Sequence, residues 1–251
     1  MMKEKRIKKI QEYVIEHQSV SLDELITVFE VSKNTIRRDI QELVHRGELK
    51  KVYGGVTTVR KRLESFQDRK IRNKGQKESI VKRASSYVED GDIIFIDSGT
   101  TTIGLFEFLK ERQLTIFTNS IDFILRAIPF EHLNVISIGG MLDPKTNSFS
   151  NPRSLDLLKD YNIKKAFMAS TGISLANGVT NASPLESELK KTIVDRSSEV
   201  YLLVDHDKFD KYGLMTYCSL AEIDYLVTDK LPSNSYQEYA RNNAIQLIIA
   251  N

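Results

Sequence analysis

The chain has 251 residues, of which 41% are hydrophobic and 28% are charged, a composition ordinary for a globular protein with one large domain or one small and one medium domain. No apolar run approaches the ~20 residues that a membrane-spanning helix needs, and the charged start lacks the apolar core of a signal peptide. Cys218, the single cysteine, has no partner for an intrachain disulfide or a thiolate metal site. We therefore expect a protein of the reducing cytoplasm, with no metal and no cofactor.

The net charge of +2 is unevenly distributed along the chain. Residues 1–62 hold 14 Lys and Arg against 9 Asp and Glu, whereas residues 63–251 hold 22 against 25. This asymmetry suits a basic domain that binds a polyanion, joined to a mildly acidic body with another task. The alternative is a basic segment of no consequence, and charge alone does not decide between the two.

Three helices are predicted in the first 46 residues, each from apolar side chains at helical spacing. Ile7, Ile10 and Val14 define the first, up to about Glu16. Ser21 to Glu24 is a capping box that begins the second, whose apolar face is formed by Leu22, Leu25, Ile26 and Phe29. Ser32 caps the third, whose buried stripe is formed by Ile36, Ile40, Leu43 and Val44. Only two residues separate the second and third helices, which is the layout of a helix-turn-helix.

The buried stripe of the third helix determines which of its side chains face away from the core. At about 100° per residue, Asn34 and Arg38 lie nearly opposite the stripe, Thr35 sits beside them and Arg37 falls on a flank. We predict that Asn34 and Arg38 reach base edges and that Arg37 and Lys33 lie nearer phosphates.

A basic β-hairpin is predicted directly after the third helix. Gly47 ends the helix, and residues 49–53 and 56–59 flank a Gly54-Gly55 turn. A hairpin in this place is a wing, which would touch the DNA backbone or minor groove. A solvated three-helix cap is the alternative, but the order of the elements favours DNA binding. The predicted DNA-binding residues are Ser32, Lys33, Asn34, Thr35, Arg37, Arg38, Lys50, Lys51 and Tyr53.

Two separated blocks of this region resemble the DeoR-type bacterial regulators. The string that is similar to their helix-turn-helix signature consists of Arg6, Ile10, Val14, Ser32 and residues 35–40, and residues 52–55 are similar to their wing. The resemblance implies a DNA-binding transcriptional regulator.

A connector and an α/β domain are predicted after the wing. Residues 60–76 are polar and rich in both charges, so we divide the chain into a winged helix-turn-helix domain (1–59), a linker (60–76) and a second domain (77–251). In the second domain, short β-branched runs alternate with helical patterns at 93–96, 115–117, 135–138, 166–169, 200–204, 225–227 and 247–249. This alternation predicts a mostly parallel, Rossmann-like sheet covered on both faces, with ligands at the carboxyl ends of its strands.

Polar or glycine-bearing loops follow several of these strands. Residues 97–102, Asp-Ser-Gly-Thr-Thr-Thr, leave the first strand and open a helix, as in a phosphate cradle; plain helix capping is the alternative. The other loops have structural alternatives as well. The loop at Asn119 can be plain helix capping, Gly139-Gly140 a tight turn, Glu186 part of a capping box, and Lys208 a surface ion pair. The predicted effector-binding residues are Asp97, Ser98, Gly99, Thr100, Thr101, Thr102, Asn119, Gly139, Gly140, Thr171, Gly172, Glu186 and Lys208.

These loops also resemble the DeoR-type sensor domain, which is related to ribose-5-phosphate isomerase and glucosamine-6-phosphate deaminase. The matching positions are Asp97, Gly99, Thr100, Thr101, Thr118, Asn119, Glu186, Lys190, Asp205, Lys208 and Phe209. The resemblance implies that the domain binds a phosphorylated sugar. The chain departs from the family pattern at Thr171, where a carboxylate is common, and at Asp207 and Asp210, where Ser and Gly are common. The loss at position 171 weakens a proton-transfer role, and the added Asp207 bears on the charge or pose of the effector.

The favoured function is a repressor of a carbohydrate-catabolism operon, which binds double-stranded operator DNA and is released by a phosphorylated sugar. The residues at 165–181 and 220–228 resemble most closely those of repressors of myo-inositol breakdown, whose effector would be a phosphorylated keto-sugar acid. The alternatives are an activator, a regulator whose effector is not phosphorylated, and a sugar-phosphate isomerase or deaminase with Glu186 as base and Lys208 as anion clamp. Symmetric half-sites favour a homo-dimer or homo-tetramer.

Overall fold

A computed structural model describes residues 3–17, 19–58, 65–151, 158 and 160–250. The chain divides into two compact units, Met1–Arg62 and Leu63–Asn251. The first unit has one hydrophobic core of its own, and the second has two.

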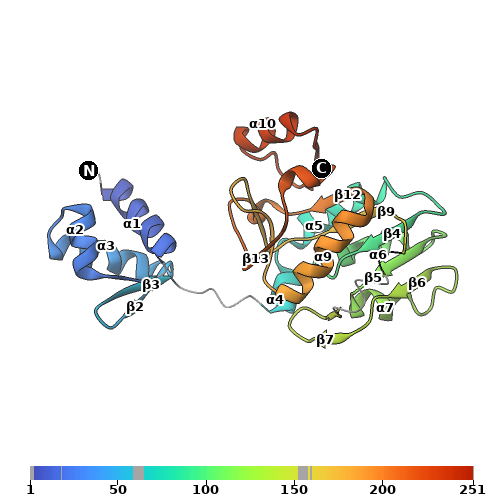
Figure 1. The fold of residues 1–251 in the computed structure, drawn as a ribbon, viewed down its shortest axis with the longest axis horizontal. Coiled ribbons are helices and arrows are strands. Elements are labelled where there is room, and N and C mark those ends of the chain that lie inside the picture. Colours follow the sequence, from blue (N-terminus) through green and yellow to red (C-terminus); the bar gives the residue numbers. More distant parts are fainter. Residues whose placement is uncertain (1–2, 18, 59–64, 152–157, 159, 251) are drawn as a thin grey trace. The chain divides into compact units, whose positions relative to one another are not determined.

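The first unit packs three helices against a small antiparallel sheet (Figure 1). The helices are α1 (Lys3–His17), α2 (Leu22–Phe29) and α3 (Lys33–His45). The strands β1 (Ser19–Ser21), β2 (Leu49–Val52) and β3 (Gly55–Thr58) lie in the order β1-β3-β2. The three predicted helices and the hairpin are confirmed. Strand β1 was not predicted, because three residues are too short to show a period.

Serine caps and two glycines define the local geometry of this unit. The backbone N–H of Glu24 donates to the Ser21 hydroxyl at 3.1 Å, and that of Thr35 donates to the Ser32 hydroxyl at 3.3 Å, so each serine begins its helix. Gly54 has a φ of +77° in the hairpin turn, and a Cβ on Gly55 would lie 2.2 Å from the Val20 carbonyl oxygen. Glycine at position 55 therefore allows β1 to pair with β3.

The second unit is built on a seven-stranded sheet in which every neighbouring pair is parallel. The strand order is β15-β14-β12-β9-β4-β5-β6. Their bounds are β4 (Ile93–Ile96), β5 (Thr115–Thr118), β6 (Asn134–Ser137), β9 (Ile163–Met168), β12 (Ser197–Leu203), β14 (Tyr225–Thr228) and β15 (Gln246–Ile249). All seven strands correspond to runs predicted from the sequence, so the parallel α/β architecture is confirmed.

Helices cover both faces of this sheet. Successive side chains of a strand point to opposite sides, and because those of the central strands are apolar, each face has a core to cover. Ile94 and Ile96 share one core with Ala84 of α5 (Lys74–Ser85), whereas Phe95 shares the other with Leu189 of α9 (Pro184–Arg196). The first core also receives η1 (Thr102–Leu105), α6 (Phe106–Leu109) and α7 (Ile121–Ala127). The second receives α9 (Pro184–Arg196), which crosses the sheet in Figure 1, and α10 (Asn234–Asn242).

Several small elements at the edge of the second unit lie outside the predicted pattern. They are the hairpin β7 (Met141–Asp143) and β8 (Ser148–Ser150), the antiparallel sheet of β10 (Gly172–Ser174), β11 (Gly178–Asn181) and β13 (Met215–Cys218), and the short helices η2 (His206–Lys208) and η3 (Leu220–Glu222). Residues 65–76, predicted as part of a linker, contain α4 (Phe66–Ile71) and the start of α5 (Lys74–Ser85), and they belong to the second unit. Residues 60–64 of that linker, and residue 59 at the end of the predicted hairpin, lie outside the described part. No helix of the described residues is long and apolar enough to cross a membrane.

Candidate nucleic-acid interface and ligand site

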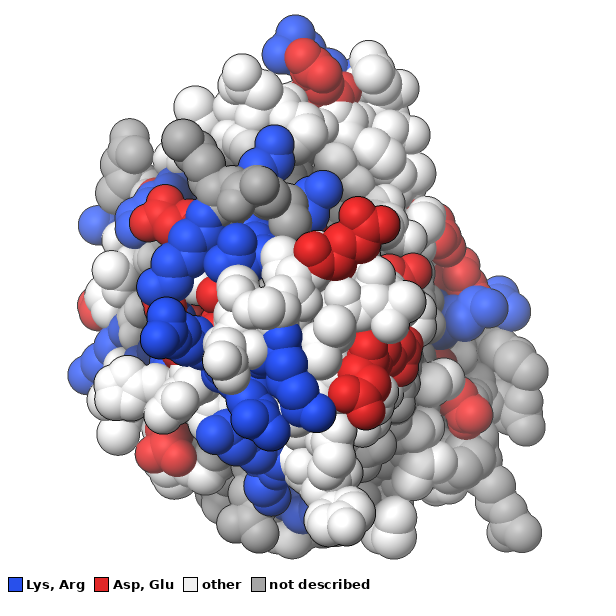
Figure 2. Space-filling model, turned by 90° about the vertical axis from the view of Figure 1, so that its left-hand side faces the viewer, with Lys and Arg blue, Asp and Glu red and all other residues white. Residues whose placement is uncertain are grey.

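Helix α3 presents a polar, cationic face away from its core. Lys33, Asn34, Arg37 and Arg38 are exposed, whereas Thr35 is half-buried and its hydroxyl lies 2.9 Å from that of Ser32. Ser32 and Thr35 therefore form the cap that begins the helix. Figure 2 shows a band of Lys and Arg on the visible face of the first unit, with few acidic residues within it.

The buried side of α3 contains one charged residue, Asp39, whose exposed fraction is 1%. Its Oδ2 lies 2.6 Å from Nε of Arg6 on α1, and this carboxylate raises the pKa of the Arg6 guanidinium. The pair fixes α1 against α3. The position of Asp39 has a sequence signal, since it falls three residues after Ile36 and four before Leu43, on the buried stripe.

The wing carries the other predicted DNA-binding residues. Lys50 and Lys51 on β2 are exposed, and Tyr53 in the turn is fully exposed. An exposed aromatic ring beside two cations has no role in packing the unit, and it suits contact with a nucleic-acid backbone or groove.

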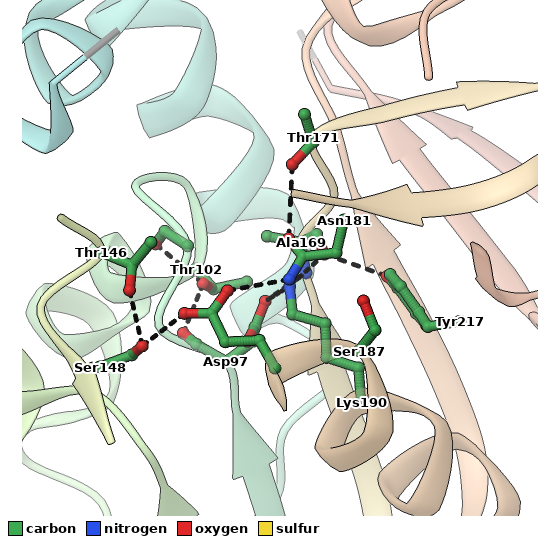
Figure 3. Close-up of polar contacts among 12 residues, drawn as sticks. Asp97, Thr102, Thr146, Ser148, Ala169, Thr171, Asn181, Ser187, Lys190 and Tyr217 are labelled. Atoms are coloured by element: carbon green, nitrogen blue, oxygen red, sulfur yellow. Dashed lines mark hydrogen bonds and ion pairs between the residues drawn. The ribbon is translucent and has the colours of Figure 1, made fainter. Parts of the chain in front are cut away.

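A second polar site lies where the central strands of the large sheet end. Asp97 follows β4, Asn119 follows β5 and Ala169 follows β9, and these strands are neighbours in the sheet. Lys190 of α9 reaches into this edge, where its Nζ donates to Oδ2 of Asp97 at 2.7 Å and to the carbonyl of Ala169 at 2.9 Å (Figure 3). Burial raises the pKa of Asp97, and the Lys190 ammonium only partly offsets that effect.

Glu186 turns its carboxylate into the same site. Its backbone N–H donates to the Ser183 hydroxyl at 3.5 Å, as the predicted cap requires, but its side chain accepts hydrogen bonds from the Ser148 hydroxyl and, at 2.8 Å, from Asn181 Nδ2. Burial opposes ionisation of this carboxyl, yet the charge of Lys190 and these hydrogen bonds outweigh it and lower its pKa. Both oxygens already accept hydrogen bonds, so Glu186 is not arranged as a free general base.

Several buried polar atoms of this edge have no partner among the described residues. They are Oδ1 of Asp97, both Oδ1 and Nδ2 of Asn119, and Oγ of Ser170. An unpaired buried polar group costs about 1–3 kcal/mol. Their concentration at one edge makes that edge a candidate site for a ligand with polar groups.

A buried cation contacts the loop that follows Asp97. Lys77 of α5 is only 7% exposed, and its Nζ donates to the Thr100 hydroxyl at 3.1 Å and to the Arg69 carbonyl. Burial lowers the pKa of Lys77 to about 8; the charge of Asp205 opposes this effect, whereas Lys208, Arg69 and Arg72 add to it. Burial likewise lowers the pKa of Lys208. A buried ammonium among like charges, with a carbonyl and a hydroxyl as acceptors, suits an anionic ligand.

The loop after β4 is held in shape by its own side chains. The Thr102 hydroxyl donates to the carbonyls of Asp97 at 2.6 Å and Gly99 at 2.9 Å, so this predicted ligand residue closes the loop. A Cβ on Gly99 would lie 2.2 Å from that of Ala169, which explains the glycine. Ser98 and Thr101 are buried in the loop, whereas Thr100 is half-buried and reaches Lys77.

Four other predicted residues are explained by local structure. Gly139 and Gly140 have φ values of +64° and +113° in the turn before β7, so the tight-turn interpretation accounts for both. A Cβ on Gly172 would lie 2.5 Å from the Lys211 carbonyl, and the Thr171 hydroxyl donates to Asn181 Oδ1 at 3.3 Å.

Of the cations in this site, the sequence analysis predicted Lys208 but missed Lys77, and it assigned Arg69 and Arg72 to the linker. Lys77 had a usable signal. It lies three residues before Ile80 and four before Val81, on the apolar face of α5, where a lysine is unusual. Ser148 had none, since the β7–β8 hairpin was not predicted. Among the described residues, no group of His, Cys, Asp and Glu is arranged to hold a metal ion.

Comparison with known proteins decides the family. A model described as a DeoR-like helix-turn-helix domain matches residues 6–62, and one described as the DeoR C-terminal sensor domain matches residues 72–230. The chain belongs to the DeoR family. It is 43% identical to the HTH-type transcriptional regulator IolR of Bacillus subtilis over 99% of this chain and 100% of that protein. It is 32% identical to the lactose phosphotransferase system repressor of Staphylococcus epidermidis, over 91% and 93%.

Solved structures show a partial likeness in fold. D-ribose-5-phosphate isomerase in complex with phospho-erythronic acid matches 54% of this chain and 54% of its own, with 18% identity and a TM-score of 0.41. The DeoR-family membership identifies the chain as a DNA-binding transcriptional regulator with a sensor domain, and not an enzyme. The predicted recognition, fold class and regulatory function are confirmed at this level.

Proposed function

We propose that the chain represses a carbohydrate-catabolism operon and that a phosphorylated sugar, bound at the carboxyl end of the large sheet, releases it from its operator. The observation that carries this proposal is the pairing of two features in one site. Unpaired buried atoms of Asp97 and Asn119 suit sugar hydroxyls, and the cations of Lys77 and Lys208 suit a phosphate. A sugar phosphate combines both chemical groups in one small molecule.

The proposed effector contacts follow from the geometry of each side chain. Asp97 Oδ1 accepts a sugar hydroxyl, and the Asn119 amide donates to one oxygen and accepts from another. Lys77, Lys208 and Thr100 hold the phosphate. The other proposed lining residues come from the loops around them and are Ser98, Gly99, Thr101, Thr102, Gly139, Gly140, Thr171, Gly172 and Glu186.

The proposed operator contacts use the exposed face of α3 and the wing. Asn34 and Arg38 read base edges in the major groove, whereas Lys33 and Arg37 contact phosphates. Lys50, Lys51 and Tyr53 of the wing add backbone contacts, and Ser32 and Thr35 hold the end of the helix that enters the groove. A single helix-turn-helix rarely binds an operator tightly enough, so we propose a homo-dimer or homo-tetramer in the cytoplasm.

The effector proposed is a phosphorylated keto-sugar acid from inositol breakdown. Two observations support this choice: the 43% identity with IolR, and the resemblance of residues 165–181 and 220–228 to repressors of that pathway. An acid adds a carboxylate as a second anionic group beside the phosphate, which suits a site with several cations.

Release from DNA tests both the proposed class of effector, a phosphorylated sugar, and the proposed pathway, inositol breakdown. Operator fragments selected by the protein from a random DNA pool are labelled, and binding is followed by fluorescence anisotropy at fixed salt. Phosphorylated intermediates of inositol breakdown should release the protein, whereas fructose and tagatose phosphates should not. The reverse ranking would discard the inositol assignment, and release by none of these compounds would discard a phosphorylated sugar as effector. A parallel assay should detect no turnover of ribose 5-phosphate.

A further inference from the structure

The joint between α4 and α5 is fastened to a single carboxylate oxygen. Oδ2 of Asp207 accepts hydrogen bonds from Arg72, at 3.1 Å from Nε and 2.8 Å from Nη2, and from Asn73 Nδ2 at 2.9 Å. The hydrogen bond from Asn73 and the pairing with Arg72 prevail over partial burial and lower the pKa of Asp207 to about 2. The carboxylate is therefore ionised at every physiological pH.

The end of α4 is also bonded to the candidate phosphate site. Lys77 donates from Nζ to the carbonyl of Arg69, in the last turn of α4, and to the Thr100 hydroxyl. Arg69 itself reaches the carbonyl of Lys145 at 3.4 Å. Helix α4 thus depends on Lys77 and Arg72, two cations that an anion at Thr100 would attract.

The Asp207 carboxylate lies within a cluster of cations and partly neutralises it. The cluster consists of Arg69, Arg72, Lys77, Lys208 and Lys211, which act on one another through their charges. A second carboxylate, Asp205, is 2% exposed and accepts the backbone N–H of Asp207 at 3.0 Å. The Asp207 side chain is 31% exposed, so a ligand can displace it from its partners.

We propose that Asp207 is an internal counter-anion which competes with the phosphate of the effector for Arg72, and that this exchange frees α4. The inference rests on the proposed function, since it names how occupancy of that site is transmitted. Helix α4 is the first helix of the sensor unit after the DNA-binding unit in the chain. Its release is the step through which occupancy of the sensor site would reach the DNA-binding unit, whose paired copies must bind two half-sites at once.

Competition makes a counterintuitive prediction for anion binding. A group that must be displaced by a ligand weakens that ligand, so removing the group strengthens binding. Asp207→Asn and Asp207→Ser should therefore bind inorganic phosphate about tenfold more tightly than the parent protein, in calorimetry at fixed ionic strength. A carboxylate with only a structural role would give weaker or unchanged binding.

Hydrogen exchange provides the second readout and needs no variant. Amides of residues 66–72 in the full-length protein should exchange faster in saturating phosphate, with α10 as an internal reference. Asp207→Asn should show the same fast exchange without phosphate. Asp210→Asn is the matched control, because it removes a nearby charge that is bonded to Tyr236 at 2.9 Å and not to Arg72; α4 should be unchanged in it.

The outcomes separate this inference from the proposed function. If phosphate binds the parent protein but α4 exchange does not respond, or if Asp207→Asn binds phosphate no more tightly, the counter-anion role is wrong while the effector site stands. If phosphate binds neither protein, both the phosphorylated effector and the counter-anion role are overturned.

Discussion

Nε of Arg6 lies 2.6 Å from Oδ2 of Asp39, so the first helix is bonded to the middle of the helix that presents Asn34 and Arg38. The carboxylate is 1% exposed and has the guanidinium as its charged partner. This pair sets the orientation of α3 from its buried side. Any DNA contact made by the opposite side of α3 therefore depends on the pair.

Removing Arg6 should therefore destabilise the first unit. Arg6→Ala leaves the Asp39 carboxylate buried without its counter-charge, and breaking a buried pair in this way costs about 3–5 kcal/mol. The Arg6 side chain is 13% exposed, so we expect a loss at the lower end of that range. Hydrogen exchange of α1 and α3 in the full-length protein measures the free energy of opening directly.

Lys3→Ala is the matched control for this prediction. It removes the 2.8 Å pair with Glu42 that also joins α1 to α3, but the side chains in that pair are 62% and 30% exposed. Exposed pairs contribute about 0.2–1 kcal/mol. Equal losses in the two variants would contradict the assignment of Arg6 as the anchor of α3.

Arg38 and Lys51 should contribute differently to DNA binding, Arg38 to sequence-specific affinity and Lys51 to affinity for any sequence. Arg38→Ala should lose about 1–3 kcal/mol on the preferred operator and relax base preference, because it removes a contact to base edges. Lys51→Ala should weaken all sequences alike and reduce the slope of log affinity against log salt by about 1. Titrations of matched and scrambled operators at several salt concentrations distinguish these effects. An Arg38→Ala protein that binds as tightly as its parent would place this residue away from the DNA bases.

The parts of the fold that follow from local periodicity were predictable from the sequence. The helix-turn-helix was visible because Ser21 and Ser32 cap helices with clear apolar stripes. All seven strands of the large sheet were visible because each is a short apolar run, in most cases rich in β-branched residues, between helical patterns. In both cases the signal lies within about ten residues, so no knowledge of distant contacts is needed.

The parts of the site that depend on distant contacts were not predictable in the same way. Lys77 and Asp207 are 130 positions apart in the sequence. Only the folded chain brings Arg72 and Asn73 to the Asp207 carboxylate. Ser148 reaches Glu186 from a hairpin of two three-residue strands, which are too short for a period. The role of Glu186 was open in the sequence for a related reason: its cap was visible, but the direction of its carboxylate was not.

Asn119→Leu should stabilise the protein and at the same time abolish its response to the effector. Both polar atoms of the Asn119 side chain are buried and unpaired among the described residues, so leucine of similar shape removes a desolvation cost of about 1–3 kcal/mol. We expect a raised melting temperature together with loss of effector-driven release from the operator.

Asn181→Leu is the comparison for that variant. Asn181 is also buried, but its Nδ2 donates to Glu186 at 2.8 Å, so the same substitution leaves a carboxylate oxygen without its partner and should lower the melting temperature. If Asn119→Leu were destabilising to the same extent, the amide would have a structural partner and the ligand role assigned to it would be wrong.

Lys77 should make effector binding depend on pH just above neutrality. Its pKa is lowered from 10.5 to about 8 by burial, so below pH 8 the lysine is protonated in both the folded and the unfolded chain and adds no pH dependence. Between pH 8 and 10.5 the unfolded chain binds more protons, and its contribution to folding stability therefore rises with pH. An anionic ligand needs the protonated form, so its affinity should fall through the same window.

Lys77→Met and Lys74→Met test this assignment, since both residues lie in the first turn of α5 but Lys74 is exposed. Phosphate affinity of the parent protein and of Lys74→Met should fall as pH rises from 7 to 9, because the anion loses a charged partner. Lys77→Met should bind weakly at every pH in that range and lack the decline. The unfolding free energy of the parent relative to Lys77→Met should increase from pH 8 towards 10.5. A difference that decreased over this interval would mean that the folded protein holds the Lys77 proton more tightly than the unfolded chain, contrary to a buried lysine among like charges.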